Sequence, residues 1–350
     1  MVAGRLRVYL SFFAVSLGMG GVTGIAQAQE VASWEWQAVT GTECRDGSEA
    51  GFFLRRRTFD KRLVVYLEGG GACFNSLTCG QNPKAVGDQF PGKEGIFQER
   101  DDNPVSGWNF VHVPYCSGDI YAGTQKGITV PGVSGKQSFM GYRNMQKILD
   151  QLQQTMPDLE TVLITGVSAG GFGAIFHFPN VKERWPDSKV VLLDDSGIPL
   201  EDTWLAPCLQ QKFRDFWGVD AALPEDCPAC RGERGGGLVE LAKWLKQSYG
   251  NAAKGIIMSL QDNTLRFFFG FGLNECRPPL IPSIPGQVFE AGVRSLRDNY
   301  LKDGFSSFVQ AGTQHTFIGG KSFYETKQSG QNIASWVQDL LNNQAQDRGP

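Results

Sequence analysis

The sequence predicts an α/β fold with a mostly parallel central sheet, helices on both faces and an inserted lid region. Short apolar runs rich in β-branched and aromatic residues recur along the chain and end in Gly, Pro, Asp or Ser, as strands do. They lie at residues 63–67, 110–113, 162–164, 190–193, 256–260 and 308–311. Their near-continuous apolar character is typical of parallel strands that are covered on both faces.

Helical patterns between these runs are the second observation. Apolar residues at spacings of three and four predict helices at 139–152, 238–245, 288–300 and 333–341. Two segments near 74–108 and 199–254 interrupt the alternation of strands and helices. In α/β sheets such insertions lie over the carboxyl ends of the strands, where ligands bind. We therefore expect them to form pocket walls, and the second to act as a lid.

The first 28 residues resemble an export signal. Arg5 and Arg7 precede an apolar run at 8–19, and Ala26-Gln27-Ala28 is a small-x-small cleavage pattern. The run is too short and too interrupted by Gly for a good membrane anchor. We expect a signal peptide at 1–28 and one domain at 29–350, exported to the periplasm or the medium as a monomer without stable membrane insertion.

Charge and cysteine content limit the partners. The 350-residue chain has a net charge of −3 and no long basic run, so nucleic acid is a poor partner. An even number of cysteines in an exported chain indicates disulfides, although their pairing stays open. A zinc site is the competing interpretation for four of them, but only one C-x-x-C pair is present, so we predict no metal. The eight are Cys44, Cys73, Cys79, Cys116, Cys208, Cys227, Cys230 and Cys276.

A candidate nucleophile lies in the stretch Gly166-Val167-Ser168-Ala169-Gly170. It follows an apolar run and precedes a small-residue segment, which is the order strand, sharp turn, helix. Small neighbours permit the crowded turn, and the turn exposes the hydroxyl at the helix N-terminus. We interpret Ser168 as the nucleophile of a hydrolase.

A serine nucleophile needs a base, which is usually a histidine. The chain has only three histidines. His177 lies nine residues past Ser168 on the expected helix, about 13 Å along its axis, so it points away. His112 falls within a strand and reads as a core residue. His315 follows the last strand in a short polar loop, the usual position of the base, so we assign it that role.

The orienting acid is expected between Ser168 and His315 in the chain. Asp262 stands alone beyond the run at 256–260, whereas Asp194 and Asp195 follow the run at 190–193. We prefer Asp262, because the other two precede Ser196-Gly197 and can instead hold that turn. Both strand ends stay open as acid positions.

Backbone donors for a developing oxyanion are also expected. Gly69 and Gly70 follow the strand at 63–67, and Ala169 follows the nucleophile. A phosphate cradle is improbable, because no Lys and Ser/Thr follow in P-loop register. We therefore predict no cofactor, and we assign Glu68 to bracing the turn.

With these residues in place, the chain resembles the pectin acetylesterase/Notum family of α/β hydrolases. The likeness is carried by 44–52 (CRDGSEAGF), 67–73 (LEGGGAC), 114–119 (PYCSGD), 166–171 (GVSAGG) and 194–197 (DDSG), and Asp262 sits where the family keeps its acid. The resemblance implies the triad Ser168, Asp262 and His315 with the oxyanion hole Gly69, Gly70 and Ala169. It also implies the disulfides Cys73–Cys79, Cys44–Cys116, Cys227–Cys230 and Cys208–Cys276.

The expected function is an exported serine esterase whose substrate is an acetylated polysaccharide such as pectin. One departure bears on the acyl group, since family members carry Trp at the position of Ala72 or Gly71 and this chain has neither. A polyester, lipid or protein-acyl esterase on the same triad is one alternative. The other is a non-catalytic carbohydrate- or protein-binding protein that keeps the fold.

Overall fold

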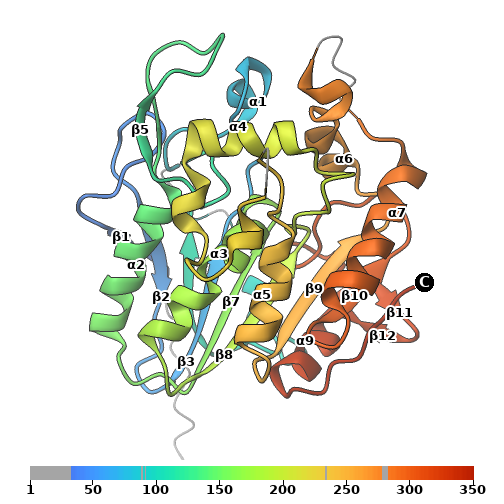
Figure 1. The fold of residues 1–350 in the computed structure, drawn as a ribbon. Coiled ribbons are helices and arrows are strands. Elements are labelled where there is room, and N and C mark those ends of the chain that lie inside the picture. Colours follow the sequence, from blue (N-terminus) through green and yellow to red (C-terminus); the bar gives the residue numbers. More distant parts are fainter. Residues whose placement is uncertain (1–32, 88–89, 91, 233–234, 278–282) are drawn as a thin grey trace, which may run out of the picture. The chain divides into compact units, whose positions relative to one another are not determined.

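A computed structural model describes residues 33–87, 90, 92–232, 235–277 and 283–350. The predicted signal peptide at 1–28 lies outside the described residues. These residues form an eight-stranded sheet in the order β1-β2-β4-β3-β7-β8-β9-β10 (Figure 1). Its strands are β1 (Glu35–Ala38), β2 (Gly51–Arg55), β3 (Arg62–Leu67), β4 (Asn109–Val113), β7 (Thr161–Val167), β8 (Lys189–Asp195), β9 (Lys254–Ser259) and β10 (Ser306–Gln310).

The sheet is mostly parallel, as predicted. The strands from β4 to β10 pair in parallel, while β1 and β2 are added at one edge in antiparallel pairing. All six apolar runs fall on parallel strands. The sequence did not indicate β1 and β2. Two short antiparallel pairs lie outside the sheet, namely β5 (Gln125–Ile128) with β6 (Gln137–Phe139) and β11 (Lys327–Gln328) with β12 (Gln331–Asn332).

Helices cover both faces of the sheet, and the strand residues alternate between two cores. Leu63, Val65 and Leu67 of β3 pack into one hydrophobic cluster, whereas Val64 and Tyr66 pack into the other. The first cluster is covered by α2 (Gly141–Thr155), α3 (Ala169–Arg184), α4 (Pro207–Trp217), α5 (Glu240–Ser248) and α7 (Gly286–Leu296). The second is covered by α8 (Ser322–Glu325), α9 (Ile333–Leu341) and a 3-10 turn, η1 (Gly95–Phe97). Burial on both faces explains why the strands read as continuous apolar runs.

The inserted segments gather at one end of the sheet. Figure 1 shows α1 (Ser76–Gln81), α4 and α6 (Asn263–Gly270) across the upper end, beyond the carboxyl ends of the parallel strands. The segment 74–108 contributes α1 and η1, and 199–254 contributes α4 and α5. This is the end at which α/β sheets bind ligands.

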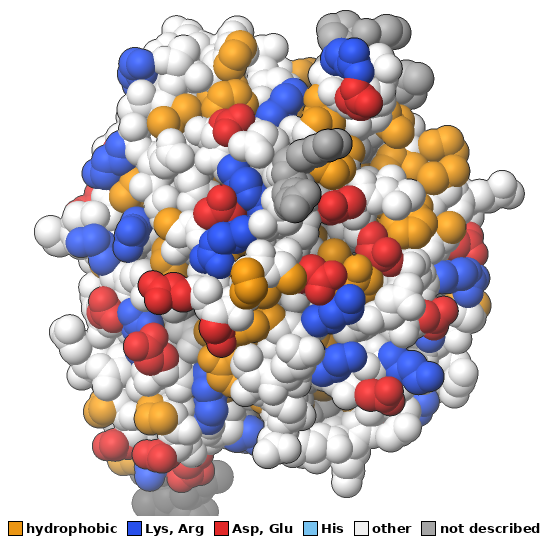
Figure 2. All heavy atoms as spheres, in the orientation of Figure 1, with side chains coloured by type: hydrophobic (Ala, Val, Ile, Leu, Met, Phe, Trp, Pro, Cys, Tyr) orange, Lys and Arg blue, Asp and Glu red, His pale blue; other side chains and the backbone are white. Residues whose placement is uncertain are grey.

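Four disulfides tie the described chain together. They are Cys44–Cys116, Cys73–Cys79, Cys208–Cys276 and Cys227–Cys230, the same pairs that the family resemblance implies. Lys and Arg side chains are interspersed with Asp and Glu on the face in Figure 2, so that face carries no extended patch of one sign. Among the described residues, no helix has both the length and the hydrophobicity that crossing a membrane requires.

Candidate active site

Ser168 occupies a strained turn between β7 and α3. Its backbone has φ 56° and ψ −120°, a conformation that a non-glycine residue rarely adopts. The turn is this tight because its neighbours are glycines: a Cβ on Gly166 would lie 2.4 Å from the Gly170 oxygen, and one on Gly170 would lie 1.9 Å from the Leu67 oxygen. The Ser168 N–H donates to the Asp195 carbonyl at 2.8 Å, which fixes the turn against the end of β8.

Asp262 is held by two elements at once. It is fully buried and caps α6, where its Oδ1 accepts hydrogen bonds from the N–H groups of Thr264 and Leu265, each at 2.9 Å. Its Oδ2 accepts from Nδ1 of His315 at 2.7 Å. Because Nδ1 is engaged, Nε2 is the imidazole nitrogen that remains for chemistry. The structure thus brings the predicted acid and the predicted base together.

Ser168 and His315 line the same open cavity of about 580 Å³. In the part of the chain that the structure describes, the Ser168 hydroxyl makes no hydrogen bond with His315 or with any other residue. Such bonds are often long or poorly aligned in free enzymes and tighten when substrate binds. The oriented His315 and the strained Ser168 therefore line one cavity, but no hydrogen bond joins them.

The other two histidines are buried. His177 lies on α3, where Nε2 donates to the Tyr121 carbonyl at 2.9 Å and Nδ1 accepts from Asn180 at 3.1 Å. Burial lowers the pKa of His177 to about 4. His112 lies on β4 among aromatic rings and stacks on Tyr66, and burial lowers its pKa to about 3. His112 also lines the 580 Å³ cavity. The sequence analysis interpreted it as a core residue and did not predict this position at the cavity.

Among the described residues, the carboxylates of Asp194 and Asp195, the last two residues of β8, make no hydrogen bond with His315. The Asp195 side chain accepts from the N–H groups of Phe317 and Ile318, at 2.6 and 2.8 Å, and from the Ser196 hydroxyl at 3.0 Å. Burial raises the pKa of Asp195 to about 6 despite these bonds. Both carboxyl oxygens of Asp194 are buried, and within the described chain no well-aligned hydrogen bond reaches them. Burial and the neighbouring Asp195 raise the pKa of Asp194 well above the usual range, although the Gly197 backbone N–H lowers it.

The glycine loop after β3 lies against the nucleophile turn. A Cβ on Gly69 would lie 3.2 Å from the Ser168 Cβ, so the loop backbone approaches the hydroxyl closely. Within the described chain, the N–H groups of Gly69, Gly70 and Ala169 donate to no acceptor. Two hydrogen bonds hold the loop in place: Asn82 donates to the Gly70 oxygen at 2.7 Å, and Glu68 accepts from the Tyr115 N–H at 3.0 Å. The N–H groups of Gly69, Gly70 and Ala169 are therefore available to an acceptor, as the predicted oxyanion hole requires.

A second cavity, which Ser168 also lines, is small and apolar. It measures about 40 Å³, and its lining residues are Gly71, Ala72, Phe74, Ile120, Ser168, Ala169, Phe172, Leu205, Leu209, Phe213, Leu238, Leu265, Phe268 and Phe269. Phe268 of α6 covers the position where the family's Trp is missing: a Cβ on Gly71 would lie 2.9 Å from the Phe268 ring. The sequence analysis did not single out Phe268, although the run Phe267-Phe268-Phe269 just after Asp262 was a signal.

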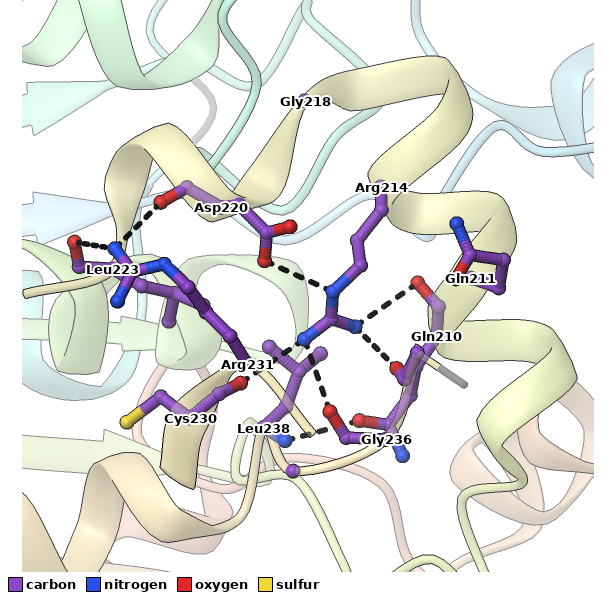
Figure 3. A network of polar contacts seen from close by, with 12 residues as sticks. Gln210, Gln211, Arg214, Gly218, Asp220, Leu223, Cys230, Arg231, Gly236 and Leu238 are labelled. Carbon is purple, nitrogen blue, oxygen red and sulfur yellow. Dashed lines mark hydrogen bonds and ion pairs between the residues drawn. The ribbon is translucent and has the colours of Figure 1, made fainter. Parts of the chain in front are cut away.

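A polar network holds the wall that 199–254 contributes to this cavity. Arg214 of α4 forms an ion pair with Asp220 at 2.9 Å and donates to the backbone oxygens of Cys230 and Gly236, each at 3.0 Å (Figure 3). Gln210, one turn earlier on α4, accepts from the Leu238 N–H at 3.0 Å. These bonds fix α4 and the loop before α5, from which Leu209, Phe213 and Leu238 reach the cavity.

The described residues hold no cluster of three or more His, Cys, Asp or Glu side chains that could bind a metal ion, and their cysteines are all paired in disulfides.

Comparisons with known proteins identify the family and several relatives of this chain. A family model described as Pectinacetylesterase matches residues 27–231, a stretch that contains Ser168 and ends before Asp262 and His315. The chain is 31% identical over 166 residues to palmitoleoyl-protein carboxylesterase notum2 of Xenopus laevis, covering 44% of this chain and 33% of that protein. It is 28% identical over 179 residues to palmitoleoyl-protein carboxylesterase NOTUM of Homo sapiens, covering 47% and 35%.

The chain matches NOTUM of Drosophila melanogaster with 29% identity over 218 residues, which is 54% of this chain and 32% of that protein. The matches thus span about a third of the length of these relatives. The family model, in contrast, covers more than half of this chain and includes the oxyanion loop, the nucleophile turn and the segment after β8. The chain therefore belongs to the pectinacetylesterase family of α/β hydrolases.

Proposed function

We propose that this protein is a serine carboxylic ester hydrolase with the triad Ser168, His315 and Asp262. The observation that carries the proposal is the 2.7 Å hydrogen bond from His315 to a fully buried Asp262, on the cavity that the strained Ser168 also lines. A serine hydroxyl is a weak nucleophile at neutral pH, and an oriented imidazole is what activates it.

The reaction proceeds through an acyl-enzyme. His315 Nε2 takes the proton of the Ser168 hydroxyl while Ser168 Oγ attacks the ester carbonyl carbon. The N–H groups of Gly69, Gly70 and Ala169 stabilise the resulting oxyanion. The imidazolium then returns its proton to the departing alcohol, and the carbonyl re-forms as an ester of Ser168. Water, activated by His315, attacks that ester and releases the acid. Asp262 keeps Nδ1 protonated and stabilises the imidazolium throughout.

The two cavities beside Ser168 define the two halves of the substrate. A cavity needs at least about 10–15 Å³ to hold one water molecule, so 40 Å³ accepts only a few heavy atoms. The apolar cavity therefore fits a short acyl group such as acetyl. The open cavity of about 580 Å³ has room for a large alcohol, and Tyr66, Glu68 and Ser322 give it polar groups.

A short acyl group on a bulky hydrophilic alcohol describes an acetylated polysaccharide such as pectin. The named relatives are palmitoleoyl-protein carboxylesterases, whose long acyl group exceeds the 40 Å³ cavity of this chain. We therefore place protein-acyl and lipid esterase activity second. Four disulfides support an exported protein, because such bonds persist in oxidising compartments.

An ester panel tests the proposal. Purified protein is assayed with nitrophenyl acetate, butyrate and palmitate and with acetylated pectin and acetylated xylan, and released acid is measured. The expected result is turnover of the acetate and acetate release from pectin, with little turnover of the palmitate. Preferred cleavage of the palmitate would support the lipid alternative. Binding to polysaccharide without hydrolysis of any ester would support the non-catalytic alternative.

A further inference from the structure

Asp195 connects the nucleophile turn to the loop that carries the base. Its backbone carbonyl accepts the Ser168 N–H at 2.8 Å, and its side-chain Oδ2 accepts the N–H groups of Phe317 and Ile318 at 2.6 and 2.8 Å. Phe317 and Ile318 lie two and three residues beyond His315. Asp195, a fully buried residue at the end of β8, is thus hydrogen-bonded both to the proposed nucleophile and to the loop that carries the proposed base.

The base loop is held at its other end as well. Before His315, the carbonyl oxygens of Gly312 and Thr313 accept from the N–H groups of Gln261 and Asn263, at 2.9 and 3.1 Å. These bonds anchor the loop to the turn that carries Asp262. After His315, the Asp195 carboxylate accepts the N–H groups of Phe317 and Ile318, while Gln314 donates to the Thr316 oxygen at 3.0 Å. The loop that carries the imidazole is therefore anchored on both sides, by the backbone of Gln261 and Asn263 before His315 and by the Asp195 carboxylate after it.

Three of the residues with a strained backbone are bonded to Asp195 or lie next to residues that are. Ser168, Ser196 and Thr316 all have positive φ, at 56°, 63° and 64°. Thr316 is β-branched, and this conformation is especially unfavourable for such a residue. Strained residues persist only where surrounding contacts determine their geometry. Asp195 supplies such contacts at Ser168 and at the two residues that follow Thr316.

We propose that Asp195 is a positioning residue, which fixes the His315 loop to the Ser168 turn by accepting the Phe317 and Ile318 N–H groups. The proposal rests on the proposed esterase function. Asp195 is fully buried and lines neither cavity beside Ser168, so it acts through the loop and not on substrate. Its removal changes the placement of the imidazole relative to the serine.

Side-chain burial alone does not account for the loop's geometry. Phe317 and Ile318 are 1% and 0% exposed, so their side chains anchor the loop in the core. Their N–H groups are taken into the same environment, and buried N–H groups require acceptors. Without the Asp195 carboxylate, two adjacent donors beside the base have no partner, and the loop must move to find water or other acceptors.

Two substitutions separate hydrogen bonding from bulk and charge. Asp195→Asn keeps a carbonyl oxygen that can accept both N–H groups, as Oδ2 does, while Asp195→Ala removes the acceptor. Asp194→Asn is the matched control, because Asp194 is the equally buried neighbour whose carboxyl accepts neither the Phe317 nor the Ile318 N–H group. For each variant, kcat and KM on nitrophenyl acetate, the rate of labelling by a fluorophosphonate, and Tm are measured.

We expect Asp195→Ala to lower kcat by about 100-fold or more with KM changed less than about threefold, and to slow labelling in parallel. Asp195→Asn should recover most of this loss, and Asp194→Asn should stay within a few-fold of the parent. A folded Asp195→Ala with parental kcat overturns the proposal. So does an Asp195→Asn variant that loses as much activity as Asp195→Ala.

A measurement on the parent protein covers the case in which Asp195→Ala does not fold. Amide hydrogen exchange followed on peptides that contain residues 315–318 should show strong protection at Phe317 and Ile318. Exchange there at the rate of an open loop overturns the proposal. An inactive parent protein with protected amides would instead contradict the esterase function, so the two failures are distinguishable.

Discussion

Nδ1 of His315 donates a 2.7 Å hydrogen bond to Oδ2 of Asp262, across 53 residues of sequence. The other oxygen of the same carboxylate caps α6, so the acid cannot rotate without uncapping a helix. Because the same carboxylate caps α6 and bonds His315, the position of α6 fixes the orientation of the imidazole.

Replacing Asp262 by Asn should lower kcat by about 10⁴-fold while the protein stays folded. An amide donates to Nδ1 and so favours the wrong imidazole tautomer, yet its carbonyl oxygen can still cap α6. Steady-state hydrolysis of nitrophenyl acetate gives kcat, and Tm reports the fold. A folded variant with kcat within tenfold of the parent would remove Asp262 from the triad.

Replacing Phe268 by Ala should extend the accepted acyl chain. The ring covers Gly71 and lines the 40 Å³ cavity, so its loss opens room for added methylenes, each favourable to bury by about 0.8 kcal/mol. The ratio of kcat/KM for nitrophenyl butyrate to that for acetate should rise by about tenfold. Phe267→Ala is the control, because its side chain is adjacent on α6 but outside the lining. Equal ratios in both variants would show that Phe268 does not limit chain length.

The parallel strands and the nucleophile turn were predictable because their signals are local. Each strand is buried on both faces, so its residues read as a continuous apolar run, and the Ser168 turn needs glycines at fixed positions. His315 could be assigned because few histidines compete. β1 escaped prediction because it is short and largely exposed, at an antiparallel edge.

The contacts of Phe268 and Asp195 depend on tertiary structure. Asp195 bonds Phe317 across 122 residues, and no spacing rule in the sequence points from one to the other. From the sequence we predicted that the Asp195 carboxylate would bond the turn after β8. It supplies only the Ser196 hydroxyl, and the longer-range bonds go to the base loop.

Adding one methyl group at Gly70 should damage the proposed oxyanion hole. A Cβ there would lie 2.5 Å from the Tyr115 ring, so Gly70→Ala must shift the loop whose N–H groups face Ser168. Loss of an oxyanion donor typically costs about 10²–10³-fold in kcat. Gly80→Ala is the control, because a Cβ at that position of α1 meets no atom within 4 Å. Parental kcat in a folded Gly70→Ala variant would exclude this loop from the oxyanion hole.

The buried His177 should make stability depend on pH. Its pKa falls from 6.5 to about 4 on folding, because burial and the positive charge of Arg184 disfavour the protonated ring. Below pH ~6.5 the unfolded chain takes up a proton that the native state does not, so this stability is present above that pH and lost as pH falls toward 4.

Between pH 7 and pH 5, the parent should lose about 2 kcal/mol more of its free energy of unfolding than His177→Gln, whose side chain does not titrate. Urea unfolding at the two pH values measures both proteins, and the contributions of the other acids and bases cancel in the comparison. Equal losses in the two proteins would show that His177 does not carry a depressed pKa.

The central claim is that Ser168 is the nucleophile, and covalent labelling tests it most directly. The protein is treated with a fluorophosphonate, digested, and the modified residue is located by mass spectrometry, with Ser168→Ala treated in parallel. We predict one phosphonate adduct on Ser168 that forms as esterase activity is lost, and no adduct in the folded, inactive Ser168→Ala variant. An adduct on another residue, or parental turnover by Ser168→Ala, would contradict the claim.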